Sequence, residues 1–423
     1  MKSYKPQVKL FSIVLALISL SACSMADKNS GGYYYEGVSY SRAAPAEDAK
    51  DPAYSNARSD FSGDMSGEDA QPSSQPTIRP GQLTCSALND NERYDYWLEL
   101  NGLKDQNQSR EFVRFKNSYG TYFDTYNRIK LTVKNGNDIS IKVKGETNKF
   151  YVDNTETAYV FAKDMKESYD VDISYLDKNN ERVTYSANVK NNDVIDLENE
   201  FTLSDKIEIM FVVDATGSMG DEMEYIKSEI IDVIGQVKEK NPDSLVTLAM
   251  MVYRDVNDSY ITKFSDFTTD IESQQRWFAS QTAAGGGDTP EAVETALKEA
   301  VEKQWSENST KLIIHVADAP SHDSDIQEWA NQAYKAADKG IKIITVSGSG
   351  ITKKTEYLFR SQSLITSGQY VFLTNDSGIG GSHIEASTDQ EPLVVEYLND
   401  CLVRLINGYA TGDFRKPVHW TQA

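Results

Sequence analysis

Three oxygen-bearing side chains follow one apolar run near the middle of the chain. Residues 207–213 read IEIMFVV, and Asp214, Thr216 and Ser218 then occupy alternate positions. Side chains at alternate positions of an extended segment point to the same side, so both hydroxyls can approach one point near the carboxylate. Hard cations such as Mg²⁺, Ca²⁺ and Mn²⁺ prefer oxygen ligands. The stretch therefore predicts a cation site at the end of a buried strand.

Two later loops carry the same kind of ligand. The stretch AAGGGDTPEAV, residues 283–293, contains Thr289, and HVADAPSHDSD, residues 315–325, contains Asp318 directly after an apolar run. Neither loop contains cysteine, so both offer oxygen and no sulfur. Ligands of open parallel sheets bind outside the carboxyl ends of the strands. We expect the three loops to meet at that edge.

The residues D-A-T-G-S-M from 214 to 219, a glycine-rich loop with threonine, and a later strand that ends in aspartate follow one another in this order. This pattern resembles the von Willebrand factor type A domain and its metal-ion-dependent adhesion site, over roughly residues 205–410. The resemblance implies direct metal bonds from Thr216 and Ser218. It implies that Asp214 and Asp318 act mostly through water.

The resemblance also implies a threonine ligand from the second loop. Thr289 is the natural choice, with its neighbour Asp288 as a group that supports the metal from outside. Alignment by the following helix instead puts Gly287 at this position. The three alternatives remain open from the sequence.

Helix capping is the simpler explanation for each hydroxyl alone. Ser218 has Asp221 three residues later, and Thr289 precedes Pro290, so each could merely begin a helix. The coincidence with two aspartates that end separate strands favours the metal site. Asp255, in the stretch VYRD, follows a strand too, but Arg254 beside it favours an ordinary surface ion pair.

The sequence offers little support for catalysis. A phosphatase of the haloacid dehalogenase type would need a second aspartate where Thr216 stands, and a G-x-S-x-G hydrolase would need glycine there. A phosphate-binding loop would need lysine after its glycines, where the chain has Asp288. The four histidines show no ligand spacing, which predicts no zinc site, and His315 lies on a buried strand. We therefore expect a binding protein and not an enzyme.

Alternating strands and helices must position these loops. Apolar strands are expected at 207–213, 244–253, 310–317, 341–348 and 369–374, and helices at 219–237, 270–281, 290–304, 325–340, 353–365 and 392–406. Such alternation predicts an α/β fold with a doubly wound, mostly parallel sheet over residues 205–410. Residues 411–423 would form a C-terminal tail.

A region rich in short strands precedes this unit. Residues 84–203 contain a helical stretch at 89–100 and alternating runs at 128–133, 139–144, 157–162, 169–176, 182–189 and 194–197, separated by turn residues. This pattern predicts a small all-β, sandwich-like domain with a supporting role.

The N-terminus predicts export. Lys2, Lys5 and Lys9 precede an apolar run too short to span a bilayer, and Leu20-Ser21-Ala22-Cys23 follows. This arrangement resembles a bacterial lipoprotein signal peptide, residues 1–22, which implies lipidation of Cys23 and a chain anchored in the cell envelope, outside the cytoplasm. Residues 23–80, rich in Ser, Gly, Asp and Pro, would form a disordered tether.

Charge and cysteine content limit the partners further. The chain has 423 residues and a formal net charge of −21, which argues against nucleic-acid binding because that affinity comes from neutralising phosphates. Cys85 and Cys401 could form a disulfide in an oxidising compartment or remain as two buried thiols. The sequence therefore predicts an envelope lipoprotein that binds a protein carboxylate through a divalent cation. A metal-independent assembly component and a metal-dependent hydrolase are the alternatives.

Overall fold

The computed structural model describes residues 77–104, 110–390 and 392–422. The predicted signal peptide at 1–22, the lipidation site Cys23 and most of the predicted tether, residues 23–76, lie outside the described residues. No helix within the described ranges is long and apolar enough to cross a membrane.

An eight-stranded, mostly parallel sheet forms the larger part of the fold, in the order β11-β10-β9-β12-β13-β14-β1-β15. The strands β10, β9, β12, β13 and β14 run parallel to one another, while β11 and β1 pair antiparallel at either side. The predicted mostly parallel α/β fold is confirmed. The strand bounds are β1 Thr84–Leu88, β9 Lys206–Asp214, β10 Leu245–Tyr253, β11 Thr262–Thr268, β12 Thr310–Ala317, β13 Ile341–Ser347, β14 Tyr370–Leu373 and β15 Glu396–Tyr397.

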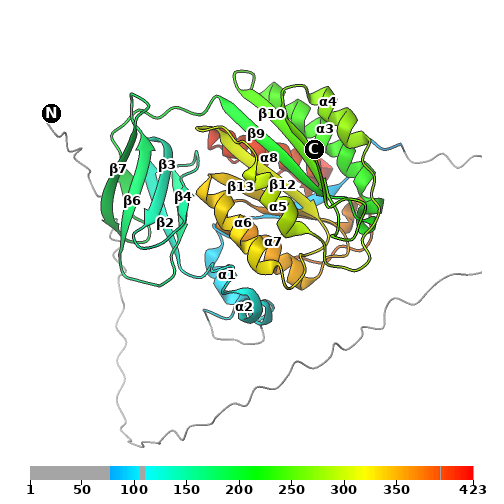
Figure 1. Ribbon diagram of the computed structural model, residues 1–423, viewed down its shortest axis with the longest axis horizontal. Helices are drawn as coiled ribbons and strands as arrows, with labels where there is room; N and C mark the ends of the chain where they lie inside the picture. The colour runs from blue at the N-terminus through cyan, green and yellow to red at the C-terminus, as the bar shows by residue number, and fades with distance from the viewer. Residues whose placement is uncertain (1–76, 105–109, 391, 423) are drawn as a thin grey trace, which may run out of the picture. The chain divides into compact units, whose positions relative to one another are not determined.

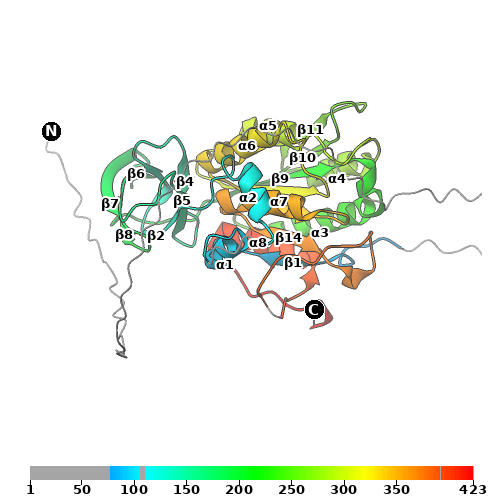
Figure 2. The same ribbon diagram turned by 90° about the horizontal axis from the view of Figure 1, so that it is seen from below.

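Helices cover both faces of this sheet. Side chains of α5 (Val293–Glu302), α6 (Ile326–Asp338) and α7 (Lys353–Ile365) share one apolar core with one face of the strands. Those of α3 (Met223–Lys240), α4 (Ile271–Ala279) and α8 (Leu398–Thr411) share a second core with the other face. Figure 1 shows α5, α6 and α7 in front of the strands, and Figure 2 shows α3 and α8 on the opposite side. The sheet is doubly wound, as predicted.

Two elements of this unit differ from the sequence-based expectation. The edge strand β11 was not predicted, because its residues TKFSDFT are mostly polar and only half-buried. The last helix was expected from residue 392 but begins at Leu398, since Glu396 and Tyr397 pair with β1 instead.

The strand β1 corrects the predicted start of the β-rich region at residue 84. β1 pairs with β14 and β15 and thus belongs to the large sheet. The helix α1 (Tyr94–Leu100) follows it, and Trp97 stacks on Tyr357 of α7 at 5.9 Å between ring centroids. A second short helix, α2 (Val113–Tyr119), places Phe115 against the same tyrosine. Residues 84–104 and 110–119 therefore pack on the large sheet and its helices.

The remaining β-strands form two small sheets, in the orders β5-β2-β8 and β4-β3-β6-β7. Their alternating buried residues form a shared core, as the alternating sequence pattern requires. The short strand β4 was not predicted. The bounds are β2 Arg128–Lys134, β3 Asn137–Val143, β4 Lys149–Tyr151, β5 Thr157–Phe161, β6 Tyr169–Leu176, β7 Arg182–Val189 and β8 Val194–Asp196.

The two cysteines of the described residues are free and fully buried. Burial raises the pKa of the Cys85 thiol well above its usual value, and the thiol of Cys401 beside it raises it further. A bridge between β1 and α8 stays a prediction.

A buried ion pair joins the segment after β1 to α7. Arg360 donates to both carboxylate oxygens of Asp90 and, through Nη1, to Glu356 Oε1 at 2.9 Å. The side chains of Arg360, Asp90 and Glu356 are only 1%, 6% and 0% exposed. Removing one partner of such a pair leaves a charge that water cannot reach.

We predict that Asp90→Asn lowers the free energy of unfolding by roughly 3 kcal/mol, the lower end of the range for broken buried pairs because Glu356 remains. Asp389→Asn is the matched control, since Asp389 pairs with Arg93 at the surface and both side chains are at least 38% exposed. That control should cost at most about 1 kcal/mol. Urea unfolding measures both values, and equal losses would contradict the role of Asp90.

Candidate metal centre

The first loop brings two hydroxyls and one carboxylate together. Asp214 ends β9, and its Oδ1 accepts hydrogen bonds from the backbone N–H of Thr216 at 2.9 Å and from Thr216 Oγ1 at 2.7 Å. Thr216 Oγ1 lies 3.2 Å from Ser218 Oγ. Both hydroxyls are thus close enough to contact one small cation. Their convergence follows the alternate spacing in the sequence.

Asp318, which follows the neighbouring strand β12, lies close to the two hydroxyls of the first loop. β12 pairs with β9 in a register that sets Val316 opposite Val213, so Asp318 emerges beside the first loop. Burial raises the pKa of the Asp318 carboxylate, and the nearby Ser218 hydroxyl partly lowers it. Four of the predicted site residues, Asp214, Thr216, Ser218 and Asp318, therefore form one cluster.

Buried carboxylate oxygens in this cluster lack hydrogen-bond partners. Asp214 Oδ2, Asp318 Oδ1 and Glu291 Oε2 are each buried and have no hydrogen-bond partner among the described residues. Burial, followed by the charge of Asp318, raises the pKa of Asp214 to about 7. Burial also raises the pKa of Asp318 to about 6 and, with the charge of Asp214 next in weight, that of Glu291 to about 9. A divalent cation would supply the missing positive charge, so these residues fit one.

The second loop approaches through its glycines. Gly217 donates its N–H to the carbonyl oxygen of Gly285 at 3.1 Å. A Cβ on Gly286 would lie 3.2 Å from Cβ of Thr216, and Gly286 has φ +69°, so only glycine permits this approach. Thr289 and Asp288 are both exposed, and neither has a hydrogen bond to the first or third loop among the described residues. The structure does not bring them into the cluster.

Glu291 is the buried acidic residue of the second loop. Its backbone N–H donates to the carbonyl oxygen of Pro320 in the third loop at 2.9 Å, and the residue is 2% exposed. Glu291 was not predicted from the sequence, because an acidic residue after proline is also typical of a helix start. Its only sequence signal is its place within the second loop, directly after Pro290.

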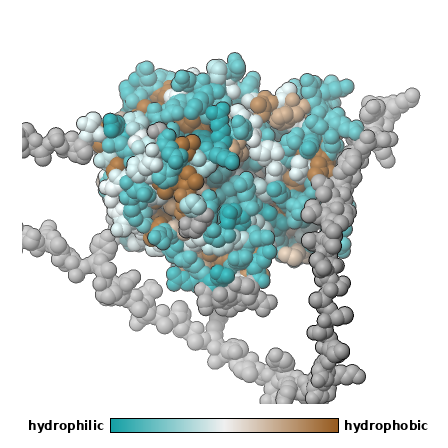
Figure 3. Space-filling model, turned by 180° about the vertical axis from the view of Figure 1, so that it is seen from behind, coloured by the Kyte–Doolittle hydropathy of each residue, from teal (hydrophilic) through white to brown (hydrophobic). Residues whose placement is uncertain are grey.

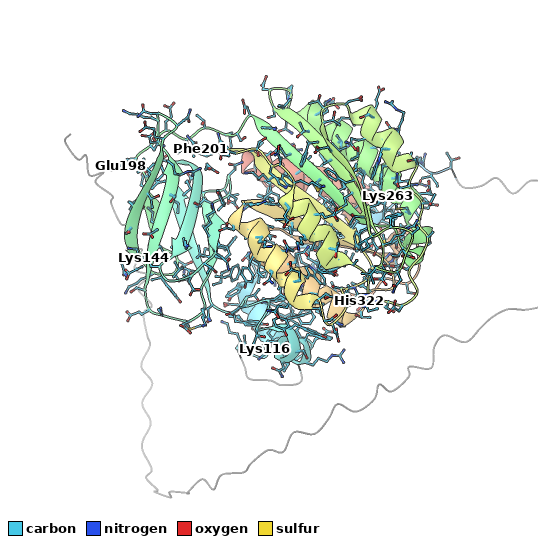
Figure 4. All side chains as sticks on the ribbon, viewed as in Figure 1. Lys116, Lys144, Glu198, Phe201, Lys263 and His322 are labelled. Carbon is cyan, nitrogen blue, oxygen red and sulfur yellow. The ribbon has the colours of Figure 1, made fainter. Side chains whose placement is uncertain are left out.

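Asp255 was wrongly interpreted as part of a surface ion pair. It is 4% exposed, and its Oδ1 lies 2.9 Å from His322 Nε2, whose pKa this hydrogen bond raises. Arg254 donates instead to the carbonyl oxygens of Ala215 at 3.0 Å and Thr282 at 2.7 Å. Arg254 therefore fastens the first loop to the second. Figure 4 labels His322, which lies where these loops gather.

Glu222, which was not among the residues predicted from the sequence, connects two further loops at the carboxyl ends of the strands. It accepts hydrogen bonds from the backbone N–H of Ser349 at 3.0 Å and faces His383 Nε2 at 2.9 Å. These partners follow β13 and β14. Glu222 therefore fixes the side of the cluster next to Asp318.

Within the described ranges, no three His, Cys, Asp or Glu side chains are arranged to hold a metal by themselves. A cation at this cluster therefore depends on the hydroxyls of Thr216 and Ser218. The chemistry of a small hard cation suits such a set of hydroxyls and carboxylates.

Comparisons with known proteins agree with this description. Residues 208–386 match the von Willebrand factor A domain family. The chain is 30% identical over 171 residues to alpha-protein kinase vwkA of Dictyostelium discoideum, which covers 40% of this chain and 27% of that protein. It is 34% identical over 116 residues to a protein described as an ariadne-like RING finger protein of Acanthamoeba polyphaga mimivirus, covering 27% of this chain and 11% of that one.

Two solved structures are also similar. BatB from Bacteroides thetaiotaomicron has 15% identity and a TM-score of 0.34, with 48% of this chain and 98% of that chain covered. An aerotolerance-related membrane protein from Bacteroides fragilis has 13% identity and a TM-score of 0.33, with 49% and 100% covered.

We predict that Glu291→Gln weakens Mg²⁺ binding about tenfold, because it removes one of the uncompensated carboxylates, a loss of about 1.4 kcal/mol. The same substitution should raise the melting temperature of the metal-free protein at neutral pH, since the folded state no longer has to hold this buried carboxyl in its protonated form. Thr289→Ala, in the same loop but exposed, should change neither quantity. Calorimetric titration with Mg²⁺ and thermal unfolding in chelator measure both. A larger loss of affinity in Thr289→Ala than in Glu291→Gln would show that the loop acts through its threonine.

Proposed function

Because residues 208–386 form a von Willebrand factor A domain, we propose that this domain binds a protein partner through a divalent cation at the carboxyl ends of β9 and β12. The observation that carries the proposal is the pair of hydroxyls, 3.2 Å apart, beside buried carboxylate oxygens without partners. Mg²⁺, Mn²⁺ and Ca²⁺ all suit these ligands.

Each residue of the cluster has a distinct task in this proposal. Thr216 and Ser218 contact the cation directly as neutral donors, whereas Asp214 and Asp318 supply the negative charge and orient water. The hydrogen bonds from Thr216 fix the carboxylate of Asp214. The bound cation would supply a positive charge that attracts a carboxylate of the partner.

The opening of the site explains how a partner reaches it. Asp214, Thr216 and Asp318 are buried, but Gly217 and Ser218 are exposed. A carboxylate would therefore approach from the side of Ser218. Because the neutral hydroxyls leave the charge of the cation largely uncompensated on this side, the approach is electrostatically favourable.

The charge of the chain makes the cation necessary for an acidic partner. A formal net charge of −21 repels carboxylates in general. The face seen in Figure 3 is mostly hydrophilic, with separate apolar patches. One contact through a cation is too little for a stable complex, so polar contacts around the site would have to add to it.

We predict that the wild-type protein, screened against a displayed library of random peptides in Mg²⁺, selects peptides that contain Asp or Glu. Their binding should disappear in chelator and when those residues are changed to Asn or Gln. Asp214→Ala should bind neither Mg²⁺ nor the peptides, because it removes the charge nearest to the cation.

Other outcomes distinguish the alternatives. Peptides or partners that remain bound in chelator would favour a metal-independent assembly component. Hydrolysis of phosphate or peptide substrates that is lost in Asp214→Ala would favour a metal-dependent hydrolase. Either result would contradict cation-mediated binding without catalysis.

We further propose that Cys23 is lipidated and anchors the chain in the cell envelope, facing outside the cytoplasm. The support is the order of the basic residues, the apolar run and the small residues before Cys23. Such an anchor would present the domain to partners outside the cytoplasm.

We predict that metabolic labelling with a fatty-acid analogue marks the wild-type chain and the control Cys85→Ala, but not Cys23→Ala. The thiol of Cys23 would be the acyl acceptor, so its removal leaves an unprocessed or soluble form. Equal labelling of Cys23→Ala and wild type would refute the anchor.

A further inference from the structure

A series of buried polar side chains leads from Asp214 to the helices that cover one face of the sheet. In order, these are Asp214 on β9, Tyr253 on β10, His315 on β12, Gln362 on α7 and Trp329 on α6, and all are 0% exposed. Asp214 and Tyr253 are paired in the parallel register of β9 and β10. The series therefore runs along one face of the sheet, beneath the cluster.

Contacts of hydrogen-bonding distance connect the last four of these side chains, from Tyr253 to Trp329. Trp329 Nε1 donates to Gln362 Oε1. Gln362 Nε2 lies 3.3 Å from His315 Nδ1, and His315 Nε2 lies 3.1 Å from the Tyr253 hydroxyl. Tyr253 and Asp214 are register neighbours on β10 and β9, and the Tyr253 hydroxyl lowers the pKa of Asp214.

Only one direction of donation satisfies this series. The indole N–H of Trp329 can only donate, so the oxygen of Gln362 accepts and its amide nitrogen faces His315. His315 Nδ1 must then accept, which leaves the proton of a neutral imidazole on Nε2. That proton is donated to the oxygen of Tyr253 and leaves the Tyr253 hydrogen free to turn toward Asp214.

The burial of His315 agrees with a neutral ring. Burial lowers the pKa of His315 to about 3, and the ring packs at 5.3 Å between centroids on Phe359 and at 5.9 Å on Tyr253. Aromatic and apolar neighbours surround it on this face. The imidazole thus acts as a fixed donor and acceptor and carries no charge of its own.

We propose that Tyr253, His315 and Gln362 are positioning residues, which present a hydroxyl hydrogen to Asp214 and so fix the orientation of its carboxylate for the cation. The cation-binding part rests on the proposed function, whereas the one-way order of donation is a property of the chain itself. Groups that orient a metal ligand from behind typically change metal affinity by about 10- to 100-fold.

Simple packing is a weaker explanation for these residues. A buried polar side chain without a hydrogen bond destabilises the fold. Apolar side chains would fill this part of the core without that cost. The order of donors, from an indole to a phenol, instead leaves the last hydrogen free beside Asp214, whose Oδ2 has no hydrogen-bond partner among the described residues. The direction of hydrogen-bond donation therefore determines which hydrogen is available to Asp214.

The first test needs no metal. Nitrogen-15 NMR of the histidine-labelled full chain in chelator, with His315 assigned from the spectrum of His315→Phe, reports which ring nitrogen carries the proton. We expect the Nε2–H form. The Nδ1–H form or a protonated ring at neutral pH would overturn the series.

The second test measures Mg²⁺ affinity by calorimetry. Tyr253→Phe removes one oxygen from a buried ring and should weaken Mg²⁺ binding about 10-fold or more. Tyr370→Phe is the matched control, because Tyr370 is 1% exposed and its hydroxyl lies 3.0 Å from Ser347 Oγ on the neighbouring strand β13. The control should lose stability similarly but keep the wild-type affinity.

Different results would contradict the positioning role and the proposed cation-dependent function. If wild type binds Mg²⁺ and both tyrosine variants bind it equally well, the positioning role is overturned while the proposed function stands. If wild type binds no divalent cation, both the positioning role and the proposed function are contradicted.

Discussion

The structure depends on negative charge buried at the ends of two neighbouring strands. Asp214 and Asp318 leave β9 and β12 at the same edge of the sheet, and each keeps one buried oxygen without a partner. Burial of uncompensated carboxylates is costly in a folded protein. The surrounding loops reduce the cost only in part, through the hydroxyls of Thr216 and Ser218. A bound divalent cation would remove the remainder, which links the stability of this edge to its capacity to bind.

The sequence predicted the site residues at the ends of β9 and β12 better than those in the loop before α5. Asp214 and Asp318 follow apolar runs, and the sheet brings such positions together whatever the loop lengths. Thr289 was chosen by its residue type, but the glycines before it carry the close approach and Glu291 turns inward. Asp255 was misjudged because its sequence neighbour is an arginine, whereas its partner His322 lies 67 residues away. Sequence adjacency does not show which direction a side chain takes at the end of a strand.

Contacts between residues far apart in the sequence also limited the prediction of the fold. Alternating apolar runs predicted the parallel strands and their covering helices, because buried strands require that pattern. Residues 84–88 were assigned to the β-rich region with no strand predicted there, because a short apolar stretch does not encode its partner. The buried pair of Asp90 with Arg360 likewise spans 270 residues. The polar series beneath the site was equally hidden, because Tyr253, His315 and Gln362 come from three separate elements. Their alignment is a consequence of the register and of the helix packing.

Anomalous diffraction from crystals soaked in Mn²⁺ tests the central claim most directly. Our account predicts one strong peak in direct contact with Thr216 Oγ1 and Ser218 Oγ, with Asp214 and Asp318 on its buried side. A wild-type crystal with Mn²⁺ at other positions and none at this cluster would contradict the account.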